Sequence, residues 1–342
     1  MIGKSGLVRS RREITIVVLS VLVYVVVRGA SLAGAINDYW QRVLDQSLIT
    51  VIGALGLSLI YGFAGQFSLG HAAFYGIGAY TAGVIGKVWG QGSVVFFLIA
   101  LLSGTLLAAL TALLVGLPIL RLRSDYLGIA TLGWAVIVKV GMDNSNKIYA
   151  PLGGATGMTG IPQVASFSWI YWFTVAIVLI MFNLISSSYG RAWMTIREDE
   201  VAADAMGIDP VRCKVTVFAI GAALAGLAGG LYANRYPYLH PSSFDFLKSF
   251  DFLLIVVLGG LGSLSGTIVT AIGWVFLLEA LRIVLGEAFI DWRGVIYALI
   301  LIATILLRSQ GLFGGKEWRL LLPPVAPAAG EERGERRGVA RG

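Results

Sequence analysis

Long apolar stretches without charge alternate with short charged ones along most of this chain. From Gln46 to Gly86 there is no Asp, Glu, Lys or Arg, and such a run of about 40 residues fits two membrane crossings of roughly 20 residues each. Counted in the same way, the whole pattern predicts ten membrane-spanning helices. We expect them at residues 14–34, 44–64, 69–86, 94–118, 124–142, 168–187, 214–232, 250–262, 265–286 and 293–308.

Two glycine-containing joins interrupt the apolar pattern, at Gly65–His71 and at Gly262–Gly266. Backbone that leaves the helix at membrane depth cannot face lipid, because unpaired amides are costly there; it is buried in protein or lines a wet cavity. The two joins also align as a weak internal repeat, and paired broken segments indicate a transport site between repeats. The predicted path residues are Gly65, Gln66, Ser68, Gly70, His71, Gly262, Ser263, Ser265 and Gly266.

Less specific interpretations of these joins stay open. The first join could be a tight turn between two ordinary spans, His71 could be a helix cap or a satisfied buried imidazole, and the repeat could be a chance similarity among small residues. The uncharged run before the second join, Phe252–Gly262, is short enough for a re-entrant loop. A crossing is favoured, because the basic tail beyond Arg308 would otherwise be exported while the basic N-terminus stayed inside.

Composition and charge support a polytopic membrane protein. Hydrophobic residues make up 57% of the 342 residues and charged residues 13%, which argues against a soluble enzyme. Most of the 26 Lys and Arg residues fall in segments that the span pattern places on one side, so both termini are expected in the cytoplasm. The predicted organisation is a basic N-terminus (1–13), a transmembrane domain (14–310) and a cytoplasmic tail (311–342) that is disordered towards its end. A signal peptide cleaved near Ala33-Gly34-Ala35 is the alternative for the N-terminus.

The long charged loop at 188–214 contains the pattern of a short amphipathic helix. The acidic run Glu198–Glu200 precedes apolar residues, and Gly207 and Pro210 end them; acidic residues in the first turn and glycine beyond the last are typical of a helix. Its apolar stripe is exposed unless a partner covers it. A helix lying on the bilayer is the alternative, which the acidic face disfavours because the inner leaflet is anionic. The candidate docking residues are Glu198, Asp199, Glu200, Ala202, Ala205, Met206 and Gly207.

The chain offers little for catalysis or metal binding. It has one cysteine, Cys213, and two histidines, His71 and His240, which are too few and too distant for a metal cluster. It has no GxxxxGK[ST] loop, so this chain is not expected to hydrolyse ATP. Glu279 and Arg282 are spaced to pair on one helix face near its outer end, where a structural ion pair is favoured over substrate contact.

Five stretches, in one order across residues 45–310, resemble the permease subunits of ABC importers for branched-chain amino acids, specifically the LivM-type subunit. One departure concerns Val136, where relatives often carry a glutamate, and it leaves the identity of the substrate open. The stretches are GLSLIYGFAGQFSLGHAAFYGIGAYTAG from Gly56, SDYLGIATLG from Ser124, GGATGMTGIP from Gly153, GRAWMTIREDEVAADAMGI from Gly190 and LGGLGSLSGT from Leu258.

The resemblance implies an all-α ABC importer permease fold of about ten transmembrane helices, with glycine-broken helices near the pore. It implies a pore-forming subunit of a bacterial cytoplasmic (inner) membrane, not an enzyme, that pairs with a second homologous permease. Two ATP-binding cassette subunits would hold ATP and Mg and dock on the 188–214 loop, and an extracytoplasmic binding protein would deliver the substrate. Membrane lipid surrounds such a subunit, and no nucleic acid and no cofactor of its own are expected.

The favoured function is ATP-driven import of branched-chain or other hydrophobic amino acids. A permease for urea, amides or other amino acids is the first alternative, since related permeases carry such solutes on similar scaffolds. An ion-coupled secondary transporter working alone is the alternative from another class. It is disfavoured because neither join carries a carboxylate of the kind that proton relays use, and because the amphipathic loop would then lack a partner.

Overall fold

The computed structural model describes residues 3–120, 124–286, 288–307 and 311–313, and these are almost entirely helical. Each of the ten predicted spans coincides with a helix. Most of the predicted tail, including the part expected to be disordered, lies outside the described residues. The helices are α1 (Gly3–Leu32), α2 (Asp38–Leu57), α3 (His71–Ile85), α4 (Val94–Ile119), α5 (Ser124–Asp143), α6 (Phe167–Ser186), α9 (Pro210–Arg235), α10 (Phe246–Gly259), α11 (Leu264–Leu285) and α12 (Ala288–Leu307).

Shorter elements extend or connect these helices. The π-helical turns η1 (Ser58–Phe63) and η2 (Gly86–Gly90) continue α2 and α3, and α7 (Ser188–Glu198) and α8 (Glu200–Ala205) lie between α6 and α9. Strands β1 (Met158–Thr159) and β2 (Tyr238–Leu239) pair antiparallel, with Met158 opposite Leu239. The 3-10 turns are η3 (Ser145–Lys147), η4 (Ala150–Leu152), η5 (Gly154–Thr156) and η6 (Pro241–Phe244).

Six helices of the described residues are long and apolar enough to cross a membrane, while α3 and α10, with 15 and 14 residues, are shorter because each adjoins a join. The apolar part of α1, Ile16–Leu32, is also shorter. The protein is therefore an α-helical polytopic one, and the full number of ten crossings stays a prediction. The six helices span Asp38–Phe63, Val94–Ile119, Tyr126–Asp143, Phe167–Ser186, Pro210–Arg235 and Leu264–Leu285.

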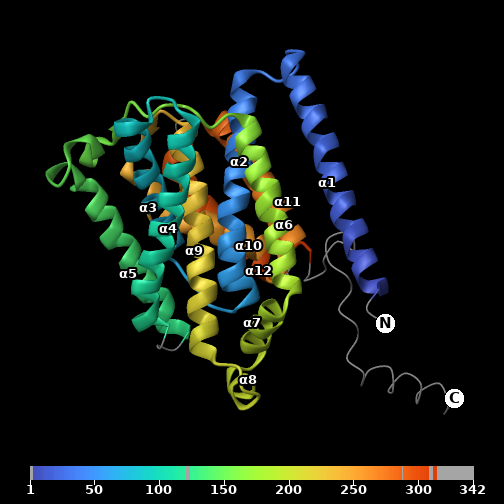
Figure 1. Cartoon of the computed structure of the whole chain (residues 1–342). Helices are drawn as coiled ribbons and strands as arrows, with labels where there is room; N and C mark the ends of the chain where they lie inside the picture. The colour runs from blue at the N-terminus through green and yellow to red at the C-terminus, as the bar shows by residue number, and fades with distance from the viewer. Residues whose placement is uncertain (1–2, 121–123, 287, 308–310, 314–342) are drawn as a thin grey trace, which may run out of the picture.

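The helices run side by side in a bundle with two distinct ends (Figure 1). The start of α1, the end of α2 and the short helices α7 and α8 lie at one end. The connection from α5 to α6 and the start of α2 lie at the opposite end. α2 and α9 stand near the middle, α5 leans away on one side, and α1 lies along the outside on the other. The charged loop and the first join therefore come to the same end of the bundle.

Glycines let α3, α4 and α9 approach one another closely. A Cβ atom on Gly229 of α9 would lie 1.9 Å from the backbone oxygen of Tyr75 in α3. One on Gly226 would lie 2.5 Å from Ala108 Cβ in α4. Both distances are far below van der Waals contact, so only glycine permits this spacing, which is the usual role of small residues between membrane helices.

A buried ion pair joins α2 to α9. Arg235 Nε donates to Asp45 Oδ2 at 2.6 Å, and the Asp45 side chain has no exposed surface. A carboxylate buried in this way is tolerated only because the guanidinium neutralises it. The pair therefore holds the two central helices in register.

Replacing Asp45 by alanine is expected to destabilise the protein, because Arg235 would lose its partner at a largely buried position. Removing one member of a buried pair costs about 3 kcal/mol or more. The matched control is Asp143→Ala, which breaks the more exposed Lys139–Asp143 pair of 2.9 Å and should cost no more than about 1 kcal/mol. Thermal unfolding of the purified protein in detergent measures both losses. Equal losses would contradict the role given to Asp45.

Candidate functional site

The first join begins where α2 widens into the π-helical turn η1 and then ends. The turn after η1 is wider than an α-helical turn, because Gln66 N donates to Ile60 O, six residues earlier, at 3.0 Å. Gly65 has a positive φ of 69°, which glycine adopts without steric cost. Residues 66–70 are not helical, and α3 starts at His71. The chain thus leaves helical conformation at the place where the sequence changes from apolar to small and polar residues.

Polar side chains of this join bond mainly to the protein itself. His71 is fully buried; its Nε2 lies 2.8 Å from the backbone oxygen of Gly53, and its ring meets the Phe252 ring edge-on. Ser68 Oγ accepts a hydrogen bond from Gly70 N at 3.4 Å. In this conformation His71 is a buried imidazole at the first residue of α3; one ring nitrogen is hydrogen-bonded, while Nδ1 has no partner among the described residues.

The second join connects α10 to α11. After Gly259 ends α10, Gly260 and Gly262 have positive φ values of 101° and 84°. Ser263 then caps α11, because its Oγ accepts a hydrogen bond from Gly266 N at 3.0 Å. A Cβ atom on Gly266 would lie 2.1 Å from the backbone oxygen of Gly259. The glycines are therefore needed for both the turn and the close return of the chain.

The second join lies against η1, the turn that leads into the first join. A Cβ atom on Gly62 of η1 would lie 3.1 Å from the backbone nitrogen of Gly262. Thr267 Oγ1 of α11 donates to Ser58 Oγ of η1 at 3.2 Å, and Ser265 is buried beside them. Tertiary packing thus brings together two segments that the sequence identified separately.

The helices α7 and α8 form one bent element beside the first join. Trp193 and Ile196 fix α7 to the protein, since they are 1% and 5% exposed. Asp199 caps α8; its Oδ1 accepts hydrogen bonds from Val201 N and Ala202 N at 2.9 and 3.0 Å. The sequence analysis did not distinguish α7 as a separate helix, although its buried tryptophan is the residue that anchors the element.

The amphipathic helix begins at Glu200, two residues after the start of the acidic run that was predicted to open it. Glu198 ends α7, because Asp199 has an extended φ of −156° and breaks the helix. Val201 and Met206 are 80% and 81% exposed, whereas Ala203 is buried. The remaining candidate docking residues are exposed: Glu200, Ala202, Ala205 and Gly207. α8 therefore presents apolar side chains outwards, away from the protein.

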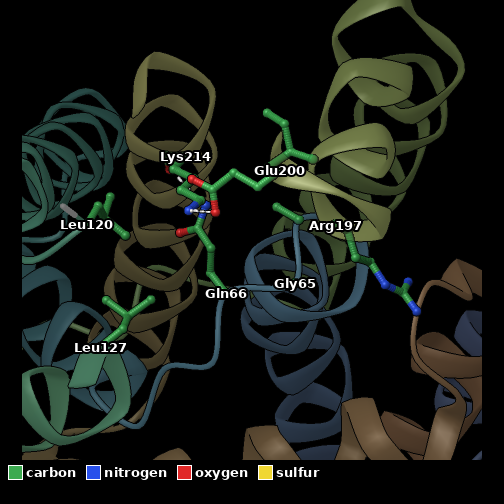
Figure 2. Close-up of a pocket in the computed structure, with 9 residues that line it drawn as sticks. Gly65, Gln66, Leu120, Leu127, Arg197, Glu200 and Lys214 are labelled. Atoms are coloured by element: carbon green, nitrogen blue, oxygen red, sulfur yellow. Dashed lines mark hydrogen bonds and ion pairs between the residues drawn. The ribbon is translucent and has the colours of Figure 1, made fainter. Parts of the chain in front are cut away.

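A cavity of about 240 Å³ lies where the first join faces α8 and the start of α9. Gln66 Nε2 donates to the backbone oxygen of Lys214 at 3.2 Å, and Lys214 Nζ pairs with Glu200 Oε2 at 2.6 Å. Figure 2 shows these three residues converging. Among the described residues, Gln66 Oε1 has no hydrogen-bond partner although it is buried. The cavity is lined by Ala64, Gly65, Gln66, Leu120, Leu127, Ile196, Arg197, Glu200 and Lys214.

The cavity combines an apolar wall with an amide, a carboxylate and an ammonium group. Two predicted path residues, Gly65 and Gln66, line it, and so does Glu200 of the docking set. Such a lining can accommodate a small solute that has an apolar part and a polar end. The other predicted path residues pack around the joins outside this cavity: Ser68, Gly70, His71, Gly262, Ser263, Ser265 and Gly266.

Arg197 is a contact residue that the sequence analysis did not single out. From the last turn of α7 its Nη1 donates to the backbone oxygen of Gly62 in η1. Its side chain extends away from Glu200 and Lys214 (Figure 2). No local pattern around position 197 indicates this partner, because the bond depends on the packing of distant segments.

Two other sequence expectations concern ionisable residues. Glu279 and Arg282 form the predicted ion pair at 3.3 Å, and Glu279 also accepts a hydrogen bond from Tyr39. Within the described part of the chain, no group of three or more His, Cys, Asp or Glu side chains could hold a metal ion. The Glu279–Arg282 pair lies on α11 and does not line the cavity.

Comparisons with known proteins identify similar sequences. Residues 39–305 match the family described as "Branched-chain amino acid transport system / permease component". The chain is 32% identical over 327 residues to the LivM permease protein of the high-affinity branched-chain amino acid transport system of Salmonella typhimurium LT2, covering 86% of this chain and 73% of that protein. It is 34% identical over 300 residues to LivM of Escherichia coli K12, covering 78% and 68%.

A more distant similarity extends to the LivH permease of the same Salmonella system, which is 23% identical over 285 residues, covering 77% of this chain and 91% of LivH. No solved structure matches the chain.

Proposed function

This chain belongs to the family of permease components of branched-chain amino acid transport systems, and on that basis we propose that it imports branched-chain or other hydrophobic amino acids. It is a permease subunit of an ABC importer. In our proposal it forms the translocation path with a second, homologous permease in the bacterial inner membrane. Two ATP-binding subunits would dock at α8, and an extracytoplasmic binding protein would deliver the substrate at the opposite end.

The packing of the second join against η1, which leads into the first join, supports this proposal. Gly62 and Gly262 bring two broken segments together, beside a cavity at the end of the bundle that holds α8. Irregular backbone between helices supplies unpaired polar groups and room for movement, which is why transport sites form at such breaks. We place the inner end of the path in the cavity, at Gly65 and Gln66.

The charge of the joins suits an amino acid. The predicted path residues include no Asp, Glu, Lys or Arg, so the joins would neither trap nor repel a zwitterion whose net charge is zero. Weak binding is sufficient, because a binding protein would supply most of the selectivity. Gln66 Oε1, which is buried without a partner among the described residues, would offer an acceptor to the substrate ammonium group.

Movement of α8 would open and close this path. Its outward Val201 and Met206 fit an apolar groove on an ATP-binding subunit, since such exposed side chains gain free energy when a partner covers them. ATP-driven closure of those subunits would displace α7 and α8 as one element. α7 packs on the protein through Trp193 and Ile196, so the displacement would be transmitted to the joins. The path would then open to one side of the membrane and, after the return movement, to the other.

Purification with native partners tests the proposal. The chain is isolated from its membrane in mild detergent, co-purifying subunits are identified, and the complex is reconstituted in proteoliposomes loaded with ATP. We expect two ATP-binding subunits, a second permease, and ATP-dependent uptake of radiolabelled leucine that valine and isoleucine compete with. Competition by urea or an amide alone would instead support the alternative substrates. Uptake that persists without ATP and is abolished by an uncoupler would support a secondary transporter.

A further inference from the structure

We propose that Arg197 is a positioning residue that transmits the displacement of α8 to both joins at once. The inference rests on the proposed function, because it concerns how ATP hydrolysis in partner subunits reaches the path. The observation behind it is one side chain that leaves the α7–α8 element, donates to a backbone oxygen of η1 just before the first join, and lies beside Gly262 of the second join.

Arg197 lies at the junction through which a movement of α8 is transmitted to α7. It lies in the last turn of α7, two residues before Asp199, the cap of α8. Because Asp199 N donates to Thr195 O at 3.0 Å while the Asp199 side chain caps α8, this junction is hydrogen-bonded on both sides. A force on the exposed Val201 therefore acts within a few residues of the Arg197 backbone.

The first contact is with the end of α2 and η1. Arg197 Nη1 donates to Gly62 O, one of the carbonyls that a helix leaves without an internal partner in its last turn. A cation is favoured at this end of a helix because the helix dipole is negative there. The stem of the side chain lies against the join as well, since a Cβ atom on Gly65 would lie 3.0 Å from Arg197 Cγ.

The second contact is with the turn before α11. A Cβ atom on Gly262 would lie 2.9 Å from Arg197 Nη1 and would therefore displace the guanidinium. The same nitrogen thus lies between Gly62 O and Gly262. Gly65 of the first join and Gly262 of the second thus both leave space that this one side chain occupies. A shift of either glycine relative to α7 would disturb the arginine.

The hydrogen bond from Arg197 to Gly62 O is of a strength that allows it to break and form again in each transport cycle. Among the described residues, no carboxylate pairs with the Arg197 guanidinium, and its hydrogen bond to Gly62 O is only partly buried. A bond from a charged donor is stronger than one between neutral groups, but water competes with it where it is exposed. Such a bond can bias two positions of the joins and still be broken during a transport cycle.

The test separates coupling from stability in the reconstituted complex. Leucine uptake and ATP hydrolysis are measured for wild type, Arg197→Gln, Arg197→Lys and the control Arg191→Gln. Arg191 lies on the same helix, but its Nη1 bonds only locally, to Ser186 O at 3.2 Å. For Arg197→Gln we expect about tenfold slower uptake, equivalent to about 1.4 kcal/mol, with ATP hydrolysis close to wild type.

Arg197→Lys should recover most of the uptake, because an ammonium group can also donate to Gly62 O, and Arg191→Gln should match wild type. A second variant, Gly262→Ala, keeps the arginine but pushes the guanidinium aside. It should uncouple in the same way, and combining it with Arg197→Gln should add little. Its control is Gly92→Ala, which has a similar φ of 83° but no atom within 4 Å of the added Cβ.

Unchanged uptake per ATP in Arg197→Gln would overturn the inference. So would a parallel fall of uptake, ATP hydrolysis and complex yield, since that pattern describes a residue that only supports the fold. These results presuppose a wild-type complex that takes up leucine with ATP. A wild-type complex without ATP-dependent uptake would instead refute the proposed function, and this inference with it.

Discussion

Replacing Gly65 by leucine is expected to abolish uptake while the protein still inserts into the membrane. Gly65 has a φ of 69° and faces Arg197 at the edge of the cavity of about 240 Å³. A leucine side chain would strain the turn and push against Arg197, at the edge of the cavity. We expect uptake to fall about a hundredfold or more, which corresponds to about 2.7 kcal/mol in the rate-limiting step.

The matched control is Gly34→Leu. Gly34 has a similar φ of 75°, but no atom lies within 4 Å of a Cβ added there. Gly34→Leu therefore has the same backbone strain as Gly65→Leu, because both place a side chain on a left-handed residue, but it makes no steric contact at the first join. Uptake is compared at equal membrane levels, measured by immunoblot. Normal uptake by Gly65→Leu at wild-type levels would show that the first join is not a tight functional element.

Introducing aspartate at both Val201 and Met206 is expected to separate the ATP-binding subunits from this chain. The two side chains are 80% and 81% exposed, and each would contribute about 1.5 to 3 kcal/mol if a partner buried it fully. Losing both, and burying charge in their place, should weaken docking by about a hundredfold or more. Co-purification of the ATP-binding subunits and leucine uptake should fall together.

Ile148→Asp provides the control for that pair. Ile148 is 85% exposed and belongs to the connection between α5 and α6, at the opposite end of the bundle from α8 (Figure 1). It introduces a charge at an equally exposed apolar position without touching the docking element. Intact co-purification and uptake with both α8 substitutions in place would mean that the ATP-binding subunits dock elsewhere.

The helices were predictable because hydrophobic run length and glycine position are local properties. The charge-free run from Gln46 to Gly86 contains the larger part of α2, all of α3 and the join between them, and Gly65, with its positive φ, follows the end of the first helix. The boundary between α7 and α8 was predicted less well. Glu198 and Asp199 both suit a first turn, and only the backbone shows that Asp199 is the cap.

The candidate site was predicted in part, for a reason that the residues make clear. Gln66 lines the cavity as expected, but His71 turns away from it to bond with Gly53 and pack against Phe252. A polar residue beside a break can cap, pack or contact solute, and the sequence does not distinguish these fates. Ser263 likewise serves as the cap of α11.

The sequence by itself determined that this is a polytopic helical membrane protein, where its helices lie, and to which family it belongs. These conclusions depend on the length of apolar runs, the positions of glycines and the order of motifs, which are local properties of the sequence. Only the tertiary structure decided that Gly62 lies against Gly262, and that Arg197 bonds to Gly62 and fills the space beside Gly262. These contacts depend on how closely whole helices approach, which is set by small residues such as Gly226 and Gly229 on other helices. Such packing is a property of the assembled bundle and of no single segment.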